Sequence, residues 1–201
     1  MATRRKRLSR EQRRAQILRS AVKVFARSNF KRAKVSDIAL EEGITEAAIY
    51  RYFPTKKAIF IEILDHIHDR ILAFWQEEVD ETDDAMEALR NMGTGYFRRA
   101  SRHSAELRVQ FQAISEADDK EIARRLRLHH RDYRAFVEGV VERGIEQGSV
   151  RAGTSAATVA YLFDSAGVFI NMMKILSERS FDEKTLERMA DHLLAPLEGP
   201  S

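Results

Sequence analysis

The sequence contains no cysteine, which excludes disulfide bonds, thiol catalysis and any cysteine-based metal site. Only 3 prolines and 9 glycines occur in 201 residues, so few positions interrupt regular structure and long helices are favoured over a many-stranded sheet. No apolar run follows the charged N-terminus, and we therefore expect no secretory signal. Apolar residues make up 44% of the chain, which is enough for a buried core.

Long hydrophobic runs are also scarce, and the stretch 156–176 is the one candidate for a membrane span. Asp164 lies near its middle, where a charge inside a bilayer would be costly. We therefore expect this stretch to be a buried helix of a soluble, cytoplasmic protein that has no membrane partner.

The formal net charge of +3 conceals a strong asymmetry along the chain. Residues 1–57 hold 16 Lys or Arg against 5 Asp or Glu, a charge of +11, whereas the rest of the chain carries −8. Such a division indicates a polyanionic partner for the basic part. A merely solvated basic tail would have the same composition, so charge alone leaves both alternatives open.

Apolar residues at helical spacing predict an all-α protein. A first helix is expected after Ser9, which can form a capping box with Gln12, and it should end near Asn29, which tolerates left-handed backbone. Gly43 ends a second, short helix, and Thr45 caps a third. Longer helices follow, so we divide the chain into a domain of short helices with a basic N-terminal arm (1–56) and a helical-bundle domain (57–201).

The two short helices between Val35 and Phe53, joined by a glycine-containing turn, have the pattern of a helix-turn-helix motif. The second helix of such a pair can enter the major groove of DNA, with its N-terminal residues against base edges. Ile44 and Ile49 would join the two helices. Spacing alone does not separate this motif from other small helical corners.

The residues themselves carry a family resemblance. Residues 17–59 resemble the DNA-binding domain of the tetracycline-repressor (TetR) family of bacterial transcriptional regulators. The matching segments are ILRSA at 17–21 with Phe25, VSDIA at 35–39, EGITEAAIYRYF at 42–53 and PTKKA at 54–58. The resemblance covers about a quarter of the chain and implies a DNA-binding regulator, not an enzyme.

The resemblance also implies DNA contacts for matching positions. The residues at phosphate-binding positions are Thr45, Tyr50 and Lys56, whose hydroxyl and ammonium groups position a protein without reading sequence. The residues at base-contacting positions are Glu46, Ala47 and Ala48. Glu46 can accept a hydrogen bond from a cytosine amino group, and the alanine methyls can pack on thymine methyls.

Other candidate DNA contacts leave alternatives open. The basic run Arg4, Arg5, Lys6 and Arg7 resembles the arm that some family members place in the minor groove. Lys34 stands where a small hydroxyl residue commonly caps the second helix, and it is a candidate phosphate contact instead. Ser36 is equally a phosphate ligand or an ordinary helix-start residue, and Tyr52 is equally a DNA contact or a packing aromatic.

Large side chains that recur on separate helices of the second domain suit either an ordinary core or the lining of a ligand pocket between helices. The family resemblance favours the pocket. The candidate pocket residues are Ile71, Trp75, Tyr96, Phe111, His129, Tyr133 and Phe163.

The stretch 156–176 is apolar nearly all round, so it must bury more than one face. One side can pack on its own subunit, and we expect the other side to pair with the last helix across a two-fold axis as a four-helix bundle. The candidate dimer residues are Ala160, Gly167, Val168, Asn171, Ile175, Leu186, Met189 and Leu193. The alternative is that this stretch is only the core helix of a monomer.

These observations predict a homodimeric one-component repressor that a small, largely apolar effector releases from a palindromic operator in double-stranded DNA. We expect no cofactor and no metal. One alternative is a TetR-like architectural or cell-division factor that acts through protein partners without a small ligand. Another is a small-molecule enzyme built around His129, which aligns with Asp132 and Tyr133, although a core histidine is the commoner meaning of that pattern.

Overall fold

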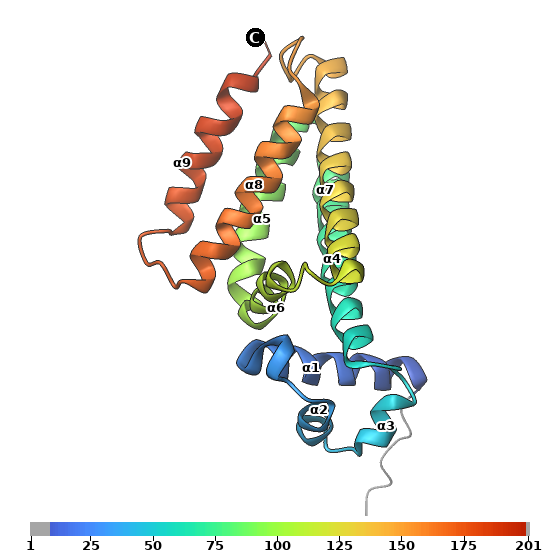
Figure 1. The fold of residues 1–201 in the computed structure, drawn as a ribbon. Coiled ribbons are helices and arrows are strands. Elements are labelled where there is room, and N and C mark those ends of the chain that lie inside the picture. Colours follow the sequence, from blue (N-terminus) through green and yellow to red (C-terminus); the bar gives the residue numbers. More distant parts are fainter. Residues whose placement is uncertain (1–8, 200–201) are drawn as a thin grey trace, which may run out of the picture.

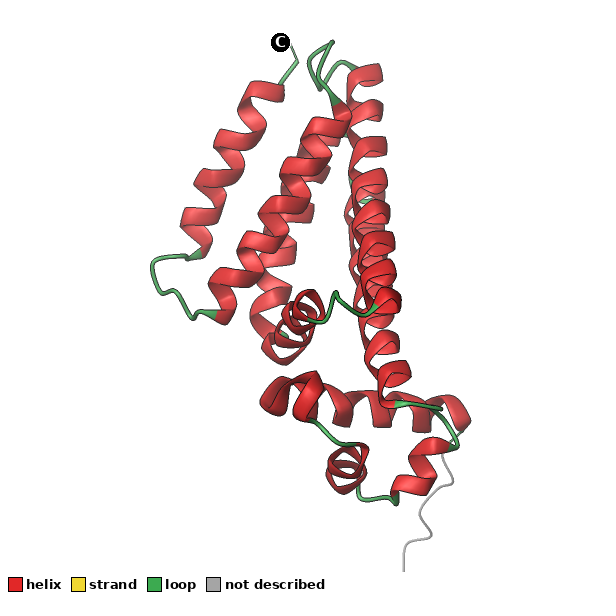
Figure 2. Ribbon diagram, in the orientation of Figure 1, coloured by secondary structure: helices red, strands yellow, loops and turns green. Residues whose placement is uncertain are grey.

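A computed structural model describes residues 9–199, and over that range the chain folds almost entirely into helices (Figures 1 and 2). The elements are α1 Arg10–Arg32, α2 Val35–Glu42, α3 Glu46–Tyr50, α4 Lys56–Asp80, α5 Ala85–Arg102, α6 Ser104–Ser115, α7 Lys120–Gln147, α8 Ala156–Ile175, α9 Glu183–Leu194 and a 3-10 turn Ala195–Leu197. Within residues 9–199 no strand forms beyond an isolated bridge between Val150 and Glu198. The predicted all-α fold class is confirmed.

Side-chain caps set the starts of the first helices where the sequence places them. The Ser9 hydroxyl accepts a hydrogen bond from the backbone N–H of Gln12 at 3.1 Å, and the Gln12 side chain accepts one in return from the backbone N–H of Ser9. Thr45 and Thr55 cap α3 and α4 in the same way. Gly43, with φ of 73°, ends α2 in left-handed geometry.

Two details of the first domain differ from the sequence prediction. Asn29 breaks the helical backbone with φ of 60°, as expected, but one further helical turn carries α1 to Arg32. The Asn29 side chain caps that turn by accepting from the backbone N–H of Arg32 at 3.1 Å. At the start of α2, Asp37 accepts from the backbone N–H of Lys34 at 3.0 Å. Asp37 therefore satisfies the backbone N–H of Lys34, whereas the backbone N–H of Asp37 donates to the Lys34 carbonyl at 3.1 Å instead of to a side-chain cap.

The helices form two regions, as Figure 1 shows. Helices α1 to α3 gather at one end, and α4 leaves them to run beside α7 through the larger helical bundle. The hydrophobic core of α1 to α3 continues into α4, α6 and α7 through Ile59, Val109 and Ile122, all fully buried. The core therefore crosses the boundary drawn at residue 57.

Three phenylalanine rings join α1 to α4 at this junction. Phe60 of α4 is fully buried and lies edge-on to Phe25, with 5.3 Å between ring centroids. Phe30, near the end of α1, lies 4.6 Å from Phe60. Aromatic pairs at such distances add stabilisation beyond simple burial, so the orientation of the first helices is tied to that of α4.

Candidate functional site

The outer face of α3 carries the residues that the sequence assigns to DNA. Ile49 is fully buried against the core, which turns Thr45, Glu46 and Ala47 outward into solvent. Tyr50 is 48% exposed. Ala48 is half-buried, so it offers less surface than its neighbours. Figure 1 places α3 at the lower end of the molecule, on the side away from α9.

Much of the positive charge of the first domain is used within the chain. Lys23 and Arg27 both pair with Glu41, at 3.2 and 2.8 Å, and these bonds lower the pKa of Glu41. By contrast, Lys34 and Arg51 are exposed and form no ion pair within residues 9–199. Arg14, Lys31 and Lys57 pair with acidic residues beyond residue 57, so the formal charge of +11 overstates the charge available to a polyanion. The basic run Arg4 to Arg7 lies outside the described residues.

Lys56 occupies a different environment from the one that the sequence predicts. Its ammonium group donates to the backbone carbonyls of Phe30 and Ala33, at 2.7 and 2.8 Å, and lies 4.7 Å from the centre of the Phe30 ring. Burial lowers the pKa of Lys56. Cations stabilise the carbonyl-rich end of a helix, so Lys56 holds the end of α1 against the start of α4 and has little capacity left for phosphate.

Two further candidates take contrasting positions. Ser36 lies exposed in the first turn of α2, whereas Tyr52 is half-buried and packs against the core of the domain. The packing role that the sequence left open for Tyr52 therefore has direct structural support, and Ser36 stays a candidate phosphate contact.

A second candidate site lies among α4 to α9, where a cavity of about 230 Å³ is lined mainly by apolar side chains. This is far more space than one water molecule needs. The structure brings all of the candidate pocket residues to its wall: Ile71, Trp75, Tyr96, Phe111, His129, Tyr133 and Phe163. Those residues come from α4, α5, α6, α7 and α8, so the cavity exists only once the bundle is assembled.

Polar groups at the cavity wall bond mostly to one another. The Tyr96 hydroxyl donates to the Asn171 side-chain oxygen at 2.8 Å, and burial raises the pKa of Tyr96 to about 12. Asp164 of α8 accepts from His130 at 2.8 Å and from Arg134 at 3.1 Å. The carboxylate in the middle of this apolar helix is therefore paired with two groups of α7.

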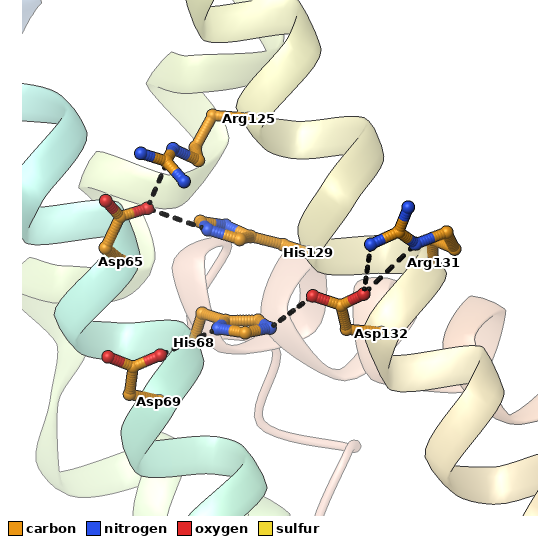
Figure 3. A network of polar contacts seen from close by, with 7 residues as sticks. All are labelled: Asp65, His68, Asp69, Arg125, His129, Arg131 and Asp132. Carbon is orange, nitrogen blue, oxygen red and sulfur yellow. Dashed lines mark hydrogen bonds and ion pairs between the residues drawn. The ribbon is translucent and has the colours of Figure 1, made fainter.

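Two stacked histidines join α4 to α7 beside the cavity (Figure 3). The rings of His68 and His129 lie 4.3 Å apart and nearly parallel, and Asp65 accepts from His129 Nε2 at 2.9 Å. Asp132 lies 3.6 Å from His68 instead of pairing with His129. The alignment of His129 with Asp132 along α7 therefore does not produce a bonded pair.

Comparison with known proteins decides the family. Residues 17–63 match the family model described as bacterial regulatory proteins, tetR family. The helix-turn-helix domain of the chain belongs to the TetR family. This first domain is a DNA-binding helix-turn-helix, and the protein is a transcriptional regulator.

The TetR-family chain resembles several regulators over most of its length. It is 24% identical to the fatty acid metabolism regulator protein of Bacillus subtilis (strain 168), over 69% of this chain and 71% of that protein. It is 26% identical to the transcriptional regulator LuxR of Vibrio harveyi, over 87% and 85% of the two chains.

Solved structures share the fold of this TetR-family chain. A TetR transcription regulator from Haloarcula marismortui ATCC 43049 superposes with a TM-score of 0.82 at 16% identity, over 94% of this chain and 99% of that one. FadR from Bacillus subtilis in complex with stearoyl-CoA has a TM-score of 0.80 at 19% identity, over 92% and 99%.

The structure revises the dimer surface expected for this TetR-family protein. Ala160, Asn171 and Leu186 are wrong choices for an outward face, because their own chain buries them. Most of the remaining candidates line the cavity: Gly167, Val168, Met189 and Leu193, of which Val168 and Met189 are also exposed. Ile175 is half-buried. Hydrophobic periodicity did not distinguish the cavity face of α8 from its outer face.

Helix α8 is also less buried than the sequence predicts. It is long and apolar enough to span a membrane, yet only 22% of its most apolar stretch of 18 residues is buried. Its outward apolar stripe consists of Tyr161, Val168, Phe169, Met172 and Leu176, which recur at helical spacing. We call these five residues the α8 stripe.

The pair of His68 and His129 should make the stability of this regulator depend on pH. Burial lowers the pKa of His129, the neighbouring His68 lowers it further, and Asp65 partly opposes both. The unfolded chain, whose histidines have a pKa of about 6.5, therefore takes up a proton more readily than the folded chain. Stability should fall as the pH drops from about 6.5 toward the folded pKa.

We expect His129→Gln to reduce this loss between pH 7.5 and 5.5, as measured by urea unfolding at each pH. The control His66→Gln changes an exposed histidine of the same helix as His68 and should keep the wild-type dependence. Equal pH slopes for wild type and His129→Gln would show that His129 does not cause the effect.

Proposed function

We propose that this regulator is a homodimeric repressor, which binds a palindromic operator through α3 and releases it when a small, largely apolar molecule fills the cavity. The division into a DNA-binding domain (1–56) and a ligand-binding and dimerisation domain (57–201) belongs to the proposal. Two copies of α3 would enter successive major grooves about 34–36 Å apart. The α8 stripe supplies an apolar face for the partner.

The observation that carries the proposal is that α6 both lines the cavity and packs on α1 of the first domain. Phe111 and Ile114 line the cavity, whereas Val109 and Ala113 of the same helix are buried in the core shared with α1. The Gln112 side chain also donates to the backbone carbonyl of Phe25 in α1, at 2.8 Å. A ligand that shifts α6 would therefore shift α1.

Helix α4 supplies a second connection between the sites. Its first turn holds Lys56 against the end of α1, and further along Ile71 and Trp75 line the cavity. A packed helix moves as a rigid element. Displacement at the cavity end of α4 would thus be transmitted to the first domain and would change the separation of the two α3 helices.

The relatives support a ligand-responsive repressor. FadR from Bacillus subtilis was solved with stearoyl-CoA, and the repressor KstR2 of Mycobacterium tuberculosis is 24% identical to this chain over 139 residues. The nucleoid occlusion factor SlmA of Shewanella frigidimarina is 35% identical, but only over 74 residues. The cavity in the rest of the chain favours the ligand-responsive function over an architectural one.

The DNA-binding part is tested by selecting bound sequences from a random DNA pool and measuring affinity for single-base variants of the selected site. Tyr50→Ala should weaken binding to all variants alike, because a phosphate contact reads no sequence. Glu46→Ala should relax discrimination at one base pair per half-site by about 1–3 kcal/mol.

Leu40→Ala is the matched control for both variants, since Leu40 is 83% exposed on α2 and has no proposed DNA contact. Its affinity and base preference should equal those of the wild type. Altered base preference in Tyr50→Ala, with none in Glu46→Ala, would reverse the contact assignment. A selected site without inverted repeats would contradict the palindromic operator.

A further inference from the structure

The charges around the cavity are balanced within the chain. Arg90 pairs with Asp191 at the cavity wall, and Asp164 is held by His130 and Arg134. Each charged side chain of the described wall thus has a partner inside the protein, His129 included through Asp65. A charged ligand would lose its hydration without gaining a free counter-charge, which is unfavourable.

Two phenols, Tyr96 and Tyr133, are neutral polar groups of this mainly apolar wall. Burial raises the pKa of both Tyr96 and Tyr133, and the charge of Asp164 raises both further, so each phenol keeps its proton. The Tyr96 hydroxyl donates its hydrogen bond to the side chain of Asn171. In residues 9–199 the Tyr133 hydroxyl makes no hydrogen bond.

The Tyr133 ring is held firmly although its hydroxyl has no partner. It packs edge-on to Trp75 at 5.4 Å between centroids, and it lies 5.1 Å from His68 and 5.9 Å from His130. A phenol can both donate and accept a hydrogen bond. Because Tyr133 lines the cavity, a ligand that offers an oxygen to its hydroxyl gains a hydrogen bond that a hydrocarbon does not.

We infer that the cavity takes a neutral, largely apolar molecule with a single hydroxyl or ketone oxygen, which hydrogen-bonds to Tyr133. This inference rests on the proposed ligand-responsive function and specifies its effector class. It disfavours carboxylates and amines of the same carbon skeleton, because neither finds an unpaired opposite charge at the wall.

The test uses Trp75 as a reporter, since it is the only tryptophan of the chain and lies against Tyr133. Full-length protein is titrated with five compounds of one skeleton: adamantane, 1-adamantanol, 2-adamantanone, adamantane-1-carboxylate and 1-adamantylammonium. Tryptophan fluorescence gives the dissociation constants. We expect the alcohol and the ketone to bind about tenfold more tightly than the carboxylate and the ammonium compound.

Tyr133→Phe separates the hydrogen bond from the shape of the cavity. We expect it to remove the advantage of the alcohol over adamantane while the affinity for adamantane itself stays unchanged, which also shows that the cavity is intact. Tyr52→Phe is the control, because Tyr52 packs in the first domain and does not line the cavity. It should leave all five dissociation constants unchanged.

The outcomes distinguish the two proposals. Tightest binding of the carboxylate or the ammonium compound, or an alcohol preference that survives Tyr133→Phe, would overturn the inference and leave the proposed function standing. A Tyr133-dependent preference for neutral oxygen compounds, without release of the selected DNA, would support the inference and contradict the proposed function. Binding of none of the five up to their solubility limits would contradict both.

Discussion

Phe169→Glu should convert the proposed dimer to monomers and lower the affinity for the selected DNA at least about a hundredfold, as expected when one recognition helix acts alone. Phe169 lies in the α8 stripe and, unlike Val168, is not part of the cavity wall. Burying an unpaired carboxylate in an apolar interface is strongly unfavourable. Phe169 is 36% exposed and its ring also lies edge-on to Phe181 at 5.3 Å, so the fold of the free chain is checked alongside its oligomeric state.

Sedimentation at micromolar concentration measures the oligomeric state, and far-UV circular dichroism checks helix content. Ala135→Glu is the matched control, since it places the same charge at an exposed position of the neighbouring α7. That variant should stay dimeric and bind DNA as the wild type does. A folded Phe169→Glu protein that is still a dimer would place the interface elsewhere.

Phe60→Ala should lower the free energy of unfolding by about 3–5 kcal/mol, the usual range for truncating a fully buried phenylalanine. The ring contacts Phe25 and Phe30, so its removal opens a cavity where α4 packs on α1. Because both helices orient the first domain, we also expect DNA binding to be lost at a temperature below that at which the larger bundle unfolds.

Urea unfolding followed by circular dichroism gives the change in stability, and DNA binding is measured over a temperature series. Leu40→Ala is also the control for this experiment, because truncating an exposed leucine should change the free energy of unfolding by no more than about 0.5 kcal/mol. A loss below about 1 kcal/mol in Phe60→Ala would mean that the Phe60 ring does not hold α4 to α1.

The sequence alone was sufficient for the helices and for seven of the residues that line the cavity. Ser9, Thr45 and Gly43 act where predicted, because a cap bonds to backbone groups only a few residues away and needs no tertiary contact. The candidate pocket residues line one cavity, because large side chains on the inner faces of several helices converge when a bundle forms.

The tertiary structure alone decided which distant groups pair. Helical spacing predicted Asp132 as the partner of His129. The packing of α4 on α7 instead brings Asp65 within hydrogen-bond distance of His129. Lys56 was a candidate for phosphate until the fold brought the end of α1 within reach of its ammonium group. Likewise, periodicity marked α8 as apolar on several faces without showing which one lines the cavity and which is exposed. Such partners depend on the register and crossing of helices, which the order of residues within one helix does not specify.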